Sequence, residues 1–61
     1  MLQYRAYPVD EEGHILGPPI LFECADDETA IKRAKQLARS HNVELWQGAR
    51  MVATFQRLAG Q

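Results

Sequence analysis

The chain has 61 residues, 46% of them hydrophobic, and seven Lys and Arg against eight Asp and Glu give a formal net charge of −1. This near-neutral balance gives no bulk attraction to nucleic acid or to an anionic membrane. No apolar run approaches the roughly 20 residues that span a bilayer, and no signal-peptide core is present, so we expect a cytoplasmic protein without membrane association. A chain this short buries only about 60% of its unfolded surface, which predicts one domain, residues 1–61, with a thin core.

The first half of the sequence predicts a β-hairpin and its continuation. Residues 2–9 are rich in aromatic and β-branched side chains, which favours a strand. Residues 10–13, three acidic residues and a glycine, predict a turn with positive φ at the glycine, and residues 14–16 are expected to return as the second arm. Two prolines in residues 17–19 lack backbone donors, which predicts a kink or bulge before strand resumes at residues 20–24.

One amphipathic helix is predicted for residues 27–41. We expect Asp26 to be its N-cap, because a carboxylate accepts hydrogen bonds from the amides of the first turn. Arg39 would lie in the last turn, and Asn42 would end the helix in the left-handed conformation. The apolar stripe that would face the sheet consists of Ala30, Ile31, Ala34, Leu37 and Ala38.

The remaining residues predict a second hairpin. Residues 43–46 form a strand, residues 47–49 a tight turn and residues 51–58 the last strand, whereas residues 59–61 are expected to fray. The order strand-strand-helix-strand-strand predicts an α+β fold of two layers, in which the helix lies on one face of a four-stranded antiparallel sheet. The sequence leaves open which strands are neighbours.

The predicted sheet carries more apolar surface than one helix can cover. If Val43 and Leu45 face the helix, Trp46 faces the other way, because strand side chains alternate. On the last strand, one face is expected to hold Met51, Ala53 and Phe55, and the other Val52 and Thr54. Large apolar patches often mark interfaces. We therefore predict a homodimer formed through the open sheet face or a strand edge, with candidate interface residues Tyr7, Leu21, Trp46 and Phe55.

Two alternatives accompany this interpretation. Trp46 could instead fold over the sheet edge of its own monomer. Lys32, Lys35 and Arg39 are expected to share the outer helix face, where they could contact nucleic acid, although a solvated face is the simpler interpretation. A stacking platform made by Tyr4 and Tyr7 is not expected, because in a regular strand the two side chains point to opposite faces and one belongs to the core.

No catalytic, cofactor or metal motif is recognisable in the sequence. Cys24 is the only cysteine, which excludes an intrachain disulfide. Its place before the helix favours reactivity, but its alternation with apolar neighbours favours a buried, inert thiol. Cys24, His14 and His41 lack zinc-ligand spacing, and the acidic residues 10–12 lack the spacing of a calcium loop. We therefore predict a non-enzymatic interaction module without a cofactor, with a second copy or another protein as its partner.

Several segments resemble a class of very short bacterial proteins of unknown function, and together they cover most of the chain: residues 4–7, 10–15, 24–31 and 43–48. This resemblance implies the same order of elements and brings no activity. The first half also resembles HicB-type antitoxin domains, which pair an acidic-Gly hairpin turn with a helix that opens in an acidic pair before Ala. Residues 10–13 and 27–30 match that pattern. The Pro-Gly-Cys stretch that those domains tend to carry before the helix is missing here.

Overall fold

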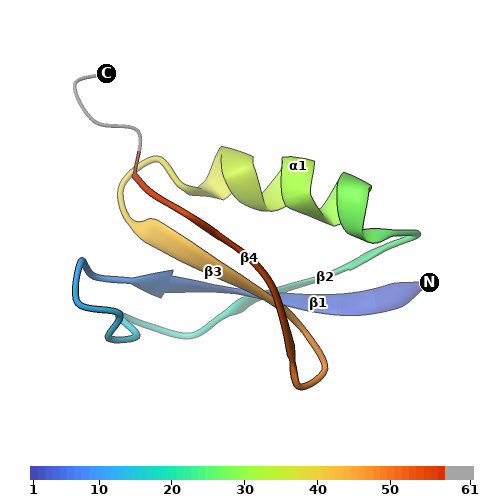
Figure 1. The fold of residues 1–61 in the computed structure, drawn as a ribbon, viewed down its shortest axis with the longest axis horizontal. Coiled ribbons are helices and arrows are strands. Elements are labelled where there is room, and N and C mark those ends of the chain that lie inside the picture. The colour runs from blue at the N-terminus through green and yellow to red at the C-terminus, as the bar shows by residue number, and fades with distance from the viewer. Residues whose placement is uncertain (58–61) are drawn as a thin grey trace.

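Four antiparallel strands form one open sheet, and a single helix lies across one of its faces (Figure 1). The computed structural model describes residues 1–57. Its elements are β1 (Leu2–Val9), β2 (Ile20–Cys24), α1 (Asp27–Leu37), β3 (Asn42–Gln47) and β4 (Arg50–Phe55). This confirms the predicted α+β fold with strand-strand-helix-strand-strand order.

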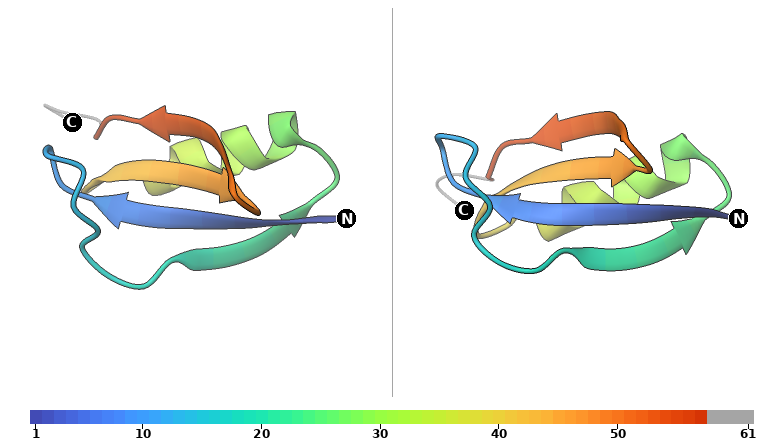
Figure 2. Two further views of the ribbon diagram at one scale, coloured as in Figure 1. Left: turned by 60° about the horizontal axis from the view of Figure 1, so that its bottom comes forward. Right: turned by 90° about the horizontal axis from the view of Figure 1, so that it is seen from below.

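The order of strands in the sheet is β2-β1-β3-β4, so that β1 and β3 are central and β2 and β4 form the edges (Figure 2). Both β2 and β3 pair antiparallel with β1, and they therefore run parallel to each other on its two sides. Parallel strands need a long crossover connection. The helix supplies that crossover, and it carries the chain across β1 while covering the sheet.

The turn after β1 forms as predicted, but the second arm of its hairpin does not. Gly13 adopts φ +88°, a conformation that costs glycine nothing. The expected strand at residues 14–16 is reduced to one bridge between Val9 and Ile15. Two backbone hydrogen bonds accompany it, from the Leu16 N–H to the Pro8 carbonyl at 2.8 Å and from the Asp10 N–H to the His14 carbonyl at 2.9 Å. Because the prolines of residues 17–19 cannot donate, pairing resumes only at β2.

The helix begins as predicted and ends earlier. Asp26 is the N-cap, and its Oδ1 accepts from the Thr29 N–H at 2.9 Å. The last helical residue is Leu37, not residue 41, so Arg39 lies beyond the helix. The prediction for Asn42 was wrong. Asn42 opens β3 opposite Val9, and no non-glycine residue in the described part of the chain has a positive φ.

The core lies between the helix and one face of the sheet. Tyr4 and Leu45 are its largest fully buried side chains, and the Tyr4 ring stacks on Phe22 with centroids 5.9 Å apart. Buried alanines on the inner side of the helix allow the helix to approach the sheet closely. Of the two tyrosines in β1, Tyr4 is therefore the core residue and Tyr7 lies on the opposite face, as the alternation predicted.

The faces of β4 differ from the prediction because its pairing with β3 is irregular. Trp46 pairs with Met51 and Leu45 with Ala53, which leaves Val52 without a partner of its own. Such a bulge changes which side each residue faces. Val52 and Phe55 consequently both pack against the core, rather than on opposite faces. The strand spans Arg50–Phe55, so the predicted extension was wrong at residues 56 and 57, which follow the end of the strand. Residue 58 and the predicted fraying of residues 59–61 lie outside the described residues.

Candidate functional site

The sheet face opposite the helix brings together three of the four predicted interface residues. Val43 and Leu45 are buried in the core, and Trp46 points the other way. Arg5 pairs with Leu21 on one side and with Trp46 on the other. Because paired residues of antiparallel strands point to the same face, one row of side chains crosses the sheet: Leu21, Arg5, Trp46 and Met51. Tyr7 begins the next row.

Phe55 does not belong to this face. It packs against the core cluster under the helix, together with Val52. Of the four predicted interface residues, the open face therefore carries Tyr7, Leu21 and Trp46, and the bulge in β4 is the reason that Phe55 faces the helix.

Hydrogen bonds within the chain join several polar side chains of the open face. The Arg5 Nε donates to the Tyr7 hydroxyl at 3.1 Å, and a terminal nitrogen of Arg5 donates to the Gly48 carbonyl at 2.7 Å. The Trp46 indole N–H donates to Glu44 Oε1 at 3.2 Å, and the indole is half-buried. The centre of this face is therefore amphipathic, and Trp46 is not its most exposed apolar side chain.

Apart from Met1, the most exposed apolar side chains instead lie in β2 and in the segment that precedes it. Leu21 and Ile15 are each 58% exposed, and Ile20 is 50% exposed. Leu16 precedes β2, Leu2 pairs with Cys24 at the other end of β2, and Met51 belongs to β4. The sequence interpretation missed Ile15, Leu16 and Ile20, because strand order was needed to show that they lie near a free edge.

A shallow apolar hollow of about 240 Å³ adjoins Ile20. It opens where the helix stops at Leu37, four residues before the predicted end, and leaves this part of the sheet uncovered. Among the described residues, His41 is the one titratable side chain that lines it, beside Ala6, Pro8, Pro18, Ile20, Leu37 and Val43. Its other lining residues are apolar, so this hollow adds to the exposed apolar surface.

The three predicted nucleic-acid contacts do not share one helix face. Lys32 and Lys35 are exposed on the helix, but Arg39 lies beyond its end, where its Nε donates to the Gln36 carbonyl at 3.3 Å. A fourth cation, Arg33, lies 5.2 Å from the centre of the Phe22 ring. The early end of the helix thus divides the strip that the sequence predicted.

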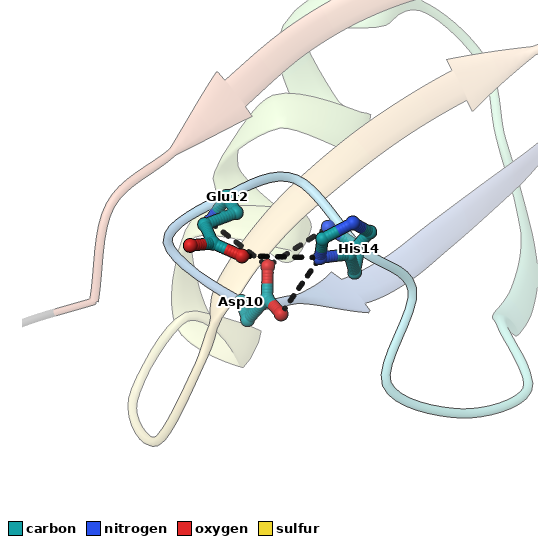
Figure 3. A network of polar contacts seen from close by, with 3 residues as sticks. All are labelled: Asp10, Glu12 and His14. Carbon is teal, nitrogen blue, oxygen red and sulfur yellow. Dashed lines mark hydrogen bonds and ion pairs between the residues drawn. The ribbon is translucent and has the colours of Figure 1, made fainter.

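In the acidic turn after β1, backbone N–H groups and the His14 ring contact the Asp10 side chain (Figure 3). Asp10 Oδ1 accepts from the N–H groups of Glu12 and His14 at 2.9 and 2.8 Å. The His14 N–H, together with that of Glu12, lowers the pKa of Asp10. His14 Nδ1 lies 3.3 Å from Asp10 Oδ2 and 3.5 Å from Glu12 Oε1. These contacts explain the cluster as a turn closed by an aspartate side chain. The sequence did not predict the contacts of His14 with Asp10 and Glu12.

A second polar network anchors the edge of the core. The Tyr4 hydroxyl donates to Asp27 Oδ1 at 2.6 Å, and Arg50 donates to both oxygens of Asp27 at 3.1 Å. Burial and the nearby Asp27 raise the pKa of Tyr4 to about 12, and the hydrogen bonds from Arg50 and Tyr4 lower the pKa of Asp27. The network joins β1, α1 and β4, and we assign it a structural role. Cys24 is buried, as expected.

Comparison of the chain with protein-family models, curated proteins and solved structures found no match. The two resemblances drawn from the sequence therefore stay predictions, and no function comes to the chain through them. Within residues 1–57, no helix is long and apolar enough to cross a membrane.

Proposed function

We propose that this chain is a non-enzymatic interaction module that associates with a second copy of itself through its sheet. The observation that supports this proposal most is the exposure of Leu21, which is 58% exposed in the middle of an edge strand. One helix of 11 residues covers only one face of the sheet. Apolar side chains left at an edge and on an open face are typical of a surface that another chain covers.

The size of the domain supports the same proposal. Domains of fewer than about 70 residues often depend on disulfides, metals or partner subunits for part of their stability. With Cys24 as the single cysteine, no disulfide can form within the chain. Burial of Leu21 and its apolar neighbours against a second copy would supply the missing apolar contact.

Light scattering on a sizing column tests the proposal, with the protein loaded from about 1 µM to about 1 mM, a range that spans common Kd values. We expect the mass to rise from that of the 6.9 kDa chain to twice that value as the concentration increases. A monomer mass at every concentration would contradict the proposal.

Nucleic-acid binding is the alternative function, and the open face does not favour it. That face carries Glu23 and Glu44 as well as Arg5, and the Arg5 guanidinium is already hydrogen-bonded within the chain. Binding through Lys32 and Lys35 would weaken steeply with added salt. Fluorescence anisotropy of labelled single- and double-stranded oligonucleotides at low salt measures this alternative directly.

A further inference from the structure

The two edges of the sheet differ in how well they are protected against pairing with another strand. β4 follows an irregular register beside β3. A bulge is a device that blunts an edge. β2 pairs with β1 through five consecutive residues without a shift, and each of the two edge strands carries one charged residue, Glu23 in β2 and Arg50 in β4. β2 is therefore an open template for a further strand (Figure 2).

Apolar exposure at this edge occurs on both faces of the sheet. Ile20 pairs with Ala6 and lies on the helix side, whereas Leu21 pairs with Arg5 and lies on the open side. Both are at least half exposed. A partner stacked on the open face would cover Leu21 alone. A strand added at the edge has side chains on both faces, so it covers both residues at once.

Of the registers centred on the three middle residues of β2, one suits a second copy of this strand. In an antiparallel pair related by a two-fold axis, opposed residues point to the same face, so the axis must pass beside a residue rather than between two. An axis at Glu23 sets two like charges against each other, which is unfavourable. An axis at Leu21 places Pro19, which has no N–H, within the paired segment.

We infer that β2 pairs antiparallel with β2 of a second copy, in the register centred on Phe22; this inference rests on the proposed self-association. All five residues of β2 are then paired: Phe22 with its own copy, Ile20 with Cys24, and Leu21 with Glu23. The two four-stranded sheets join into one sheet of eight strands. Both helices lie on the same face of that sheet.

Cysteine cross-linking tests the register. Leu21→Cys and Glu23→Cys are each placed in a Cys24→Ala background, and both changes fall on exposed positions. A disulfide needs Cα atoms about 4.4–6.8 Å apart, as directly opposed residues are. We therefore expect a disulfide-linked dimer when the two variants are mixed and oxidised, and none from either variant alone. Cys24→Ser is the second background if Cys24→Ala does not fold.

The outcomes separate this inference from the proposed function. Self-linking of the Leu21→Cys variant, or of the Glu23→Cys variant, would overturn the register centred on Phe22. A dimer by light scattering that gives no cross-link in any combination would overturn the β2 contact and leave self-association standing. A monomer at every concentration would overturn both.

Discussion

Tyr4 illustrates how a single residue satisfies both the core and its polar boundary. Its ring is fully buried against Phe22, and its hydroxyl reaches Asp27 at the start of the helix. A buried phenol needs a hydrogen-bond partner. Asp27 also binds Arg50 in β4. The carboxylate thus links β1, α1 and β4, in addition to placing a favourable negative charge in the first turn of the helix.

Ionisation of Tyr4 is expected to lower the stability of the folded chain at alkaline pH. The pKa of its hydroxyl is about 12 in the folded chain, against about 10 when unfolded. A group with a raised pKa contributes stability that is fully present below pH about 10 and is lost as the pH rises towards 12. We expect Tyr4→Phe to show a shallower loss of the urea midpoint over this range than the parent. Tyr7→Phe is the matched control, and an identical pH profile for Tyr4→Phe and the parent would refute the prediction.

The elements follow their local signals where the signal acts within a few residues. The N-cap at Asp26 and the turn glycine at Gly13 both form as predicted. The C-terminal end of the helix does not, because Asn42 pairs with Val9 and the chain must leave the helix early to reach β3. A helix end thus depends on the strand that follows it as well as on its own sequence.

Substitution of Gly48 tests whether the turn between β3 and β4 needs a residue with positive φ. It adopts φ +62°, and a Cβ added there would meet nothing within 4 Å. Gly48→Ala therefore imposes backbone strain without a clash, and we expect a loss of about 1–2 kcal/mol in the free energy of unfolding. Gly17→Ala is the control, because Gly17 has equal space and no positive φ. Equal urea midpoints for the two variants would contradict this account.

At the scale of the whole molecule, the two edges of the sheet differ in apolar exposure and in regularity. Apolar exposure concentrates in β2 and the segment before it, and a bulge interrupts the pairing of β4. This asymmetry favours a closed pair formed through β2 over continued growth into a fibre, because a two-fold contact uses the same edge of both copies.

Charged substitutions in β2 are expected to change the stability of the proposed dimer. In the proposed register, Leu21→Glu sets a negative charge against Glu23 at two symmetric places, and we expect the dimer Kd to rise roughly tenfold. Adding Glu23→Lys should restore the affinity, because opposite charges then face each other. Trp46→Ala, in central strand β3, should change the Kd less than Leu21→Glu does. Analytical ultracentrifugation measures all three, and failure of the double variant to recover would count against the contact.

Local chemistry in the sequence was enough to predict the order of elements, the helix start, the glycine turn and the opposite orientations of Tyr4 and Tyr7. Each depends on neighbouring residues or on the two-residue repeat of a strand, and the fold confirmed them. Strand order, the helix end, the inward position of Phe55 and the bond between Tyr4 and Asp27 were decided only in the tertiary structure. They depend on pairings between residues far apart in the chain, which no local pattern encodes. The free β2 edge is one of these tertiary features, and it supplies the binding surface proposed here.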